Sequence, residues 1–296
     1  MNRREFLSAS GAALWGVARA LGEEANTGIR WQRRSDSKLF QGVAVDGRPL
    51  VLPDEGVGLF DGFCRTIEDG KLGREIVFGG DRPSGECGPV AISLEHRLLS
   101  FTGGKEDLLE ATLTLRSRAD RPCEVFCGFL TGARPSPVAG DQQVYVPISA
   151  SGLRDPADDK RGRMKDCRQA VGSEGFLCHY LEPQASDPRQ STTRASLLAP
   201  VVDVFADGGP CHIALFSSSM EPVLFQALQG PSSKAWRVAR RVRLEPNETH
   251  VFTAWLLLHQ GDATEAWKAF HRFGHKEDFP DKIGRASCRE RVYHPV

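Results

Sequence analysis

The sequence predicts an all-β protein, a large antiparallel β-sandwich with one helix near its C-terminal end. Two features of the 296-residue chain support this fold class. Many short segments alternate apolar and polar residues, which is the period of a strand with one face in the core and one in water. Clusters of Gly, Pro, Asp and Asn separate these segments, and no helix is expected among them. Strands in such number without intervening helices favour two packed antiparallel sheets.

The clearest strand runs from Leu109 to Arg116, where four apolar residues at the odd positions alternate with polar or charged ones. A turn at 117–122 and a second strand from Cys123 to Leu130 follow it, so the two strands are expected to form a hairpin. Further strands are predicted at Lys38–Val45, Gly73–Phe78, Val90–His96, Gln143–Ile148, Phe176–Leu181, Val201–Ala206, His212–Ser217, Val223–Leu228, Trp236–Leu244 and His250–His259.

One helix is predicted after the last strand. Asp262 is a good N-cap, with Glu265 three residues later, and Gly274 ends the pattern. The apolar stripe between them consists of Ala263, Ala266, Trp267, Phe270 and Phe273. A closed sandwich leaves no obvious surface for this stripe, so residues 261–282 are predicted to form a linker helix toward a further domain.

Residues 1–20 have the pattern of a twin-arginine export signal. Arg3 and Arg4, followed by Phe6 and Leu7, open a short apolar stretch that ends in an Ala-x-Ala cleavage site at Ala20. We therefore expect a periplasmic or extracellular protein whose mature sandwich spans residues 21–260. No other stretch approaches the length of a membrane span, so no membrane association is expected after the signal is removed.

The last residues have a different character. Residues 283–292 resemble a translated sequencing adapter in one reading frame, so 283–296 are interpreted as a non-native tail. The alternative is a short basic terminus. Under the adapter interpretation, the native gene is expected to continue past Lys282.

Charge and cysteine content argue against nucleic-acid binding and against a metal or cofactor site. The chain carries 38 basic and 38 acidic side chains, and the balance falls to about −4 without the two ends, because each end holds three Arg and one Glu. A chain with this net charge lacks the excess of basic residues with which proteins bind nucleic acid. No Cys-x-x-Cys or zinc-type Cys/His spacing occurs, so no metal and no cofactor is expected. Buried free cysteines are expected, and the disulfide connectivity is left open.

The longest irregular segment, 149–175, holds the candidate ligand-binding residues. Arg154, Asp155, Asp158 and Asp159 lie in it among other charges, and such side chains can hydrogen-bond sugar hydroxyls. The alternative is a solvated loop of mixed charge. The aspartates do not follow calcium-loop spacing.

Other motifs carry simpler interpretations. His271 and His275 have the i, i+4 spacing of a metal site, but no Glu follows His271, so helix-dipole electrostatics is preferred. Trp31, Trp236 and Trp255 could stack on sugars, yet strand tryptophans are more often core anchors. No pair of carboxylates is singled out as catalytic.

Two regions resemble a known family. The segment from Glu95 through Pro135, with the Leu109–Leu115 strand, and the stretch from Arg241 to the helix at 261–263, resemble the N-terminal β-supersandwich of melibiase-like glycoside hydrolases, the group of α-galactosidases and raffinose synthases. The resemblance implies a galactose-mutarotase-like sandwich that precedes a catalytic barrel. In that family the catalytic carboxylates lie in the barrel, so the resemblance assigns no catalytic residue here.

The resulting expectation is a non-catalytic β-sandwich portion of an exported glycoside hydrolase, with carbohydrate and its own C-terminal catalytic domain as partners. The alternative is a stand-alone exported sandwich that binds carbohydrate or serves as a scaffold. A complete lyase or epimerase on a sandwich is a third possibility that no motif supports.

Overall fold

The computed structural model describes residues 28–33, 38–51, 57–80, 82–103, 106–136, 142–146, 168–171, 176–180, 195–197, 199–219, 222–229 and 234–275. The export signal, the adapter-like tail and the charged residues at 154–159 lie outside these ranges. Among the described residues, no helix has the length and apolar character needed to cross a membrane.

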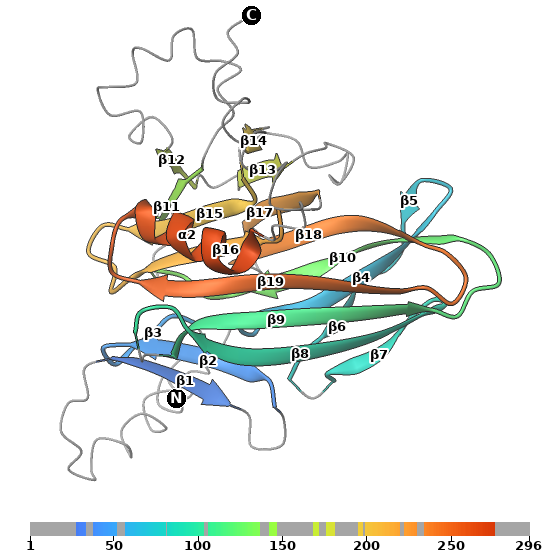
Figure 1. The fold of residues 1–296 in the computed structure, drawn as a ribbon, viewed down its shortest axis with the longest axis horizontal. Coiled ribbons are helices and arrows are strands. Elements are labelled where there is room, and N and C mark those ends of the chain that lie inside the picture. Colours follow the sequence, from blue (N-terminus) through green and yellow to red (C-terminus); the bar gives the residue numbers. More distant parts are fainter. Residues whose placement is uncertain are drawn as a thin grey trace, which may run out of the picture.

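Two large sheets pack face to face and confirm the all-β class (Figure 1). Sheet I has the order β14-β13-β17-β18-β10-β4-β5, with β6 also paired to β4. Its strands are β4 (Asp61–Glu68), β5 (Lys71–Leu72), β6 (Ile76–Phe78), β10 (Cys123–Thr131), β13 (Phe176–Tyr180), β14 (Ala195–Leu197), β17 (Val223–Gln229) and β18 (Lys234–Leu244).

Sheet II has the order β12-β11-β15-β16-β19-β9-β8-β7. Its strands are β7 (Ser84–Cys87), β8 (Val90–Ser100), β9 (Glu106–Ser117), β11 (Gln142–Tyr145), β12 (Arg168–Ala170), β15 (Val201–Ala206), β16 (His212–Ser217) and β19 (Thr249–His259). The described strand pairs of both sheets are antiparallel, except for the parallel pair β13 and β14. A third, small sheet, β1 (Ile29–Arg33), β2 (Phe40–Val45) and β3 (Arg48–Pro49), lies beside one end of sheet II.

The expected hairpin between the strands at 109–116 and 123–130 is wrong. β9 pairs with β8 and β19 in sheet II, whereas β10 pairs with β4 and β18 in sheet I. The turn at 117–122 therefore carries the chain from one sheet to the other. Because both strands bury an apolar face, the sandwich can place them in opposite layers, and sequence proximity alone could not decide between these arrangements.

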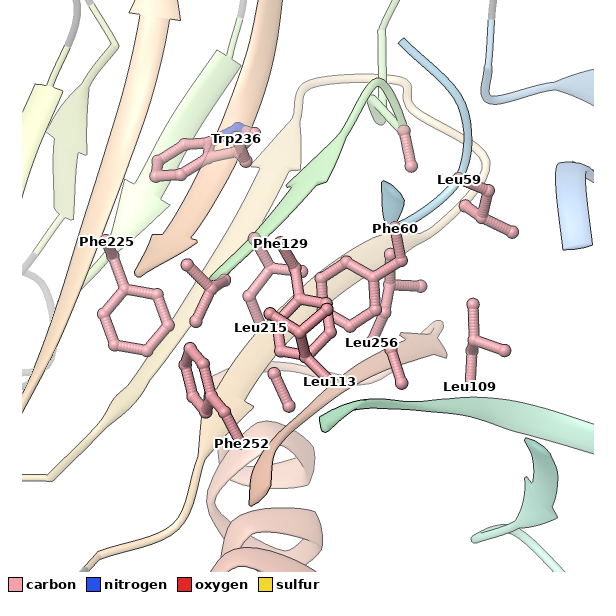
Figure 2. Packing of buried hydrophobic residues seen from close by; sticks show 14 of the residues in the cluster. Leu59, Phe60, Leu109, Leu113, Phe129, Leu215, Phe225, Trp236, Phe252 and Leu256 are labelled. Carbon is pink, nitrogen blue, oxygen red and sulfur yellow. The ribbon is translucent and has the colours of Figure 1, made fainter. Parts of the chain in front are cut away.

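The main core fills the space between the sheets. Phe129 of β10 lies at its centre, with ring centroids 5.1 Å from both Phe60 and Phe252 (Figure 2). Leu113 and Leu215 come from sheet II and are fully buried against this aromatic group. Trp236 and Trp255 are also buried, which confirms that these two tryptophans anchor apolar clusters.

The C-terminal helix begins where the sequence predicts. Asp262 caps α2 (Ala263–Ala269), and its side chain accepts a hydrogen bond from the Thr264 backbone N–H at 2.9 Å. A turn of π-helix, η5 (Phe270–Gly274), continues it. Phe270 and its neighbours pack on the outer face of sheet II against Phe216 and Trp255. The apolar stripe thus has a partner within the sandwich, and it no longer argues for a further domain.

His96 joins the small sheet to sheet II. Its Nδ1 accepts a hydrogen bond from the Phe40 backbone N–H at 3.0 Å, which leaves the proton on Nε2, 3.0 Å from the Phe60 carbonyl oxygen. Burial lowers the pKa of His96 to about 4, although the bond to the Phe60 carbonyl opposes this shift. The folded protein therefore holds the His96 ring in its neutral form, between the Phe40 backbone N–H and the Phe60 carbonyl oxygen.

We expect this histidine to make stability depend on pH. In the unfolded chain His96 takes up a proton near pH 6.5, whereas in the folded chain it does so only near pH 4. The contribution of neutral His96 to the free energy of unfolding is therefore fully present above pH 6.5. Between those values, the free energy of unfolding should fall by up to about 1.4 kcal/mol per pH unit as the pH drops. Urea unfolding at pH 7 and pH 5 should show this loss in the wild type and a smaller one in His96→Gln. An NMR titration of the His96 ring with a midpoint above 6.5 would contradict the expectation.

Candidate functional site

A recess of about 580 Å³ opens at the end of sheet II where the small sheet meets the start of α2. The β1 and β2 strands contribute one wall, the connection between β8 and β9 contributes a second, and the end of β19 contributes a third. The described residues that line it are Gly28, Ile29, Val45, Asp46, Thr102, Asp107, Cys211, Leu258, His259, Gln260, Gly261 and Glu265.

Turn chemistry holds two of the lining carboxylates in place. Asp46 and Gly47 form the tight turn between β2 and β3, both with positive φ (48° and 76°), which is typical of an Asp-Gly hairpin turn. The exposed Asp46 side chain therefore sits at the rim. Asp107 is buried, and its carboxylate accepts hydrogen bonds from the backbone N–H groups of Phe101 (2.7 Å) and Thr102 (2.9 Å) and from the Thr102 hydroxyl.

A cluster of three titratable side chains adjoins the recess. Asp203 lies on β15, His212 begins β16, and His259 ends β19. The Asp203 carboxylate bridges the two rings, with Oδ2 2.9 Å from His212 Nδ1 and Oδ1 3.1 Å from His259 Nε2. We call these three residues the Asp-His-His cluster.

Strand register brings the cluster together. β15, β16 and β19 are neighbours in sheet II, His212 pairs with His259, and Asp203 pairs with Ala214, two residues along β16. Side chains two residues apart on a strand share a face, so Asp203 and His212 both point to the outer face. The ring of Phe205, also from β15, stacks on His212 with centroids 5.0 Å apart.

The cluster runs from the surface into the protein. The His212 side chain is 28% exposed, that of His259 only 2%, and that of Asp203 is fully buried. Burial alone would raise the pKa of Asp203, but the hydrogen bonds from His212 and His259 outweigh it and leave the pKa below its ordinary value. The carboxylate is therefore ionised at neutral pH. Nδ1 of His259 is also buried and has no hydrogen-bond partner among the described residues.

The sequence did not predict this site. Its ligand-binding candidates, Arg154, Asp155, Asp158 and Asp159, lie outside the described residues, so that prediction stays untested. The other histidine pair, His271 and His275, lies on η5 and just after it, with ring centroids 5.5 Å apart. The available signal for the cluster was the single charged residue in the apolar strand Val201–Ala206, since a buried carboxylate needs a partner.

Thiols form a separate buried group. Cys64, Cys87, Cys127, Cys178 and Cys211 are buried and free, as expected, and Cys123 is half-buried and free. Hydrogen bonding with Cys87 and burial raise the pKa of the Cys64 thiol. Cys211 lines the recess, and burial together with the nearby Asp203 and Asp46 carboxylates raises its pKa to about 12. It is therefore a neutral thiol at physiological pH.

Comparison with known proteins shows similarity only at the level of structure. No protein-family model matches the sequence, and no curated protein matches it. Solved structures with a similar chain path include a polysaccharide lyase, at 10% identity and a TM-score of 0.46, which covers 83% of this chain. This chain spans about a third (34%) of that lyase's length.

Two smaller proteins match over nearly their whole length. A galactose mutarotase related enzyme from Lactobacillus acidophilus is 9% identical, with a TM-score of 0.42 over 79% of this chain and 96% of its own. A galactose mutarotase-like protein from Lactobacillus casei is 9% identical, with a TM-score of 0.40 over 78% of this chain and 100% of its own. The similarity is one of β architecture, and the melibiase-like resemblance of the sequence stays a prediction.

Proposed function

We propose that this chain is a carbohydrate-binding β-sandwich and that the recess at the end of sheet II receives a non-ionic saccharide. The observation that carries the proposal is the chemistry of the lining. Asp46, Asp107 and Glu265 bring carboxylates, Thr102 and Gln260 bring a hydroxyl and an amide, and the described lining includes no Lys or Arg.

This lining suits a neutral ligand rich in hydroxyl groups. Sugar hydroxyls donate hydrogen bonds to carboxylates and to the amide oxygen, while the apolar Ile29, Val45 and Leu258 offer surface to the C–H groups of a sugar ring. A phosphate, a sulfate or a uronic acid would instead meet like charge. The volume of about 580 Å³ lies in the range of small-molecule sites.

The geometry supports binding rather than glycoside hydrolysis. Hydrolysis needs a pair of carboxyl groups that flank the bond and act as acid, base or nucleophile. Both oxygens of Asp107 already accept hydrogen bonds from its own loop. His259 turns Nε2 to Asp203 and keeps Nδ1 buried, so its ring is not placed to exchange protons with a ligand. Under this proposal the module binds a saccharide without cleaving it, and no hydrolysis of aryl glycosides is expected.

The test is calorimetric binding of neutral oligosaccharides to the full chain and to three variants. Gln260→Ala and Asp46→Ala should each weaken binding about tenfold, the equivalent of one hydrogen bond of ~1.4 kcal/mol. Glu86→Ala is the matched control, because Glu86 is an exposed carboxylate on the edge strand β7, is not among the lining residues of the recess, and pairs with Arg118. Equal losses in all three variants, or a preference for anionic saccharides, would contradict the proposal.

We further propose that this module belongs to a larger exported glycoside hydrolase. The support is in the sequence: the twin-arginine pattern with Arg3 and Arg4, the melibiase-like resemblance, and the adapter-like residues after Lys282. Sequencing of the native gene beyond the Lys282 codon should show a reading frame that continues into a barrel domain. An in-frame stop within a few codons would favour the stand-alone binding module instead.

A further inference from the structure

We propose that the Asp-His-His cluster binds one divalent transition-metal ion, with Zn²⁺ as the probe, through one ligand atom each of Asp203, His212 and His259. This inference goes beyond the proposed saccharide binding, although His259 also lines the recess. It is tested without any saccharide, so either proposal can fail while the other stands.

The first observation is geometric. The candidate ligand atoms of the three residues all lie within 4.8 Å of one another. Bonds of about 2.0–2.1 Å in a tetrahedral arrangement would separate ligand atoms by about 3.4 Å. Oδ2 of Asp203 lies 2.9 Å from His212 Nδ1, and the other oxygen, Oδ1, lies 3.1 Å from His259 Nε2, so each ring has one carboxylate oxygen near that distance. Small rotations of the side chains would therefore be enough to admit an ion.

The second observation is independent of that spacing. Nδ1 of His259 is buried and has no hydrogen-bond partner among the described residues, in a side chain that is only 2% exposed. Such a nitrogen costs free energy unless something satisfies it, and unsatisfied buried polar groups in native proteins call for an explanation. An ion bound by Nδ1 of His259 would satisfy this nitrogen, whereas an ion bound by Nε2 would leave it unpaired.

The donor set selects the class of ion. Two imidazoles and a carboxylate suit Zn²⁺ and its first-row neighbours, while Ca²⁺ and Mg²⁺ prefer shells of oxygen ligands. The ionised Asp203 would compensate half of the ion's charge within the protein. The partly exposed His212 gives an ion a route from solvent. Three protein ligands leave at least one position for water.

A bound ion would join three strands of sheet II. β15, β16 and β19 are adjacent, and α2 packs across their outer face beside the cluster. The ion would hold the end of β19 in a fixed position just before Gln260 and the recess. Its expected effect is thus stabilisation, because an ion that binds the folded chain and not the unfolded one shifts the equilibrium toward the fold.

The experiment uses the full chain after dialysis against a chelator, with a reducing agent present. Calorimetry should show one Zn²⁺ bound per chain, and zinc should raise the Tm, whereas Mg²⁺ and Ca²⁺ should do neither. Co²⁺ should give visible d–d bands without the charge-transfer absorption of thiolate ligands, which separates this cluster from the buried cysteines. These wild-type measurements need no variant to fold.

Matched histidine variants then locate the ion. His212→Gln should lower the affinity for zinc at least 100-fold, because it removes a ligand while Asp203 keeps its bond to His259. His271→Gln, from the other histidine pair, should bind zinc as the wild type does. No zinc binding by the folded wild type would show a hydrogen-bonded cluster only and overturn the proposal. Wild-type affinity in His212→Gln, or a thiolate absorption with Co²⁺, would overturn it as well.

Discussion

Gly128→Ala should abolish folding. Gly128 lies in β10 at the middle of sheet I, paired with Ala239 on one side and Phe63 on the other. A Cβ at this position would lie 2.1 Å from the Val238 carbonyl oxygen and 2.7 Å from Ala239 Cα, both of them backbone atoms. The strand cannot move away without breaking a ladder, so we expect a loss above about 4 kcal/mol in the free energy of unfolding.

The control for this substitution is Gly28→Ala. No atom lies within 4 Å of a Cβ built on Gly28, so the same chemical change should alter stability by less than about 0.5 kcal/mol. Urea unfolding followed by circular dichroism compares the two variants. A cooperative transition of Gly128→Ala near that of the wild type would show that β10 and β18 do not pair in this register.

Leu113→Asp should also prevent folding, whereas Thr114→Asp should be tolerated. Leu113 is fully buried between the sheets, where it pairs with Phe252 and Leu94 (Figure 2). A carboxylate there would be an unpaired charge in an apolar core. Thr114 points to the other face, opposite Val251, which is 52% exposed, so its carboxylate would reach water. We expect a change of about 1 kcal/mol or less for Thr114→Asp.

The comparison of the two neighbours tests the strand register directly, because a slip of one residue exchanges the buried and exposed faces. Soluble yield and thermal unfolding of both variants are sufficient. Similar behaviour of Leu113→Asp and Thr114→Asp would contradict the register of β9 against β8 and β19.

The strands of sheet II were the most predictable part of the fold. Val201–Ala206 and His212–Ser217 begin and end where the sequence predicts, because each is a short, nearly continuous apolar run with turn residues on both sides. β4, at Asp61–Glu68, was missed. Its buried stretch, Gly62 to Cys64, has only three residues and begins with a glycine, so the sequence shows neither an alternating pattern nor a long apolar run there.

The candidate site was less predictable than the fold. Asp203, His212 and His259 are up to 56 residues apart, and they meet only because β19 returns beside β16 after the chain has visited sheet I. The sequence marks each residue as a polar group at or near the end of an apolar strand, but no local spacing joins them. The helix shows the same limit: its cap and stripe were local and predictable, whereas the surface that it covers was not.

The most direct test of the central proposal is to map a neutral oligosaccharide onto the backbone amide signals of the isotope-labelled chain by NMR. We expect concentration-dependent shifts at Asp46, Thr102, Gln260 and Gly261, which line the recess, and none at Glu86 on β7. Shifts confined to surfaces away from the recess, or no shifts with any neutral saccharide in a folded sample, would contradict it.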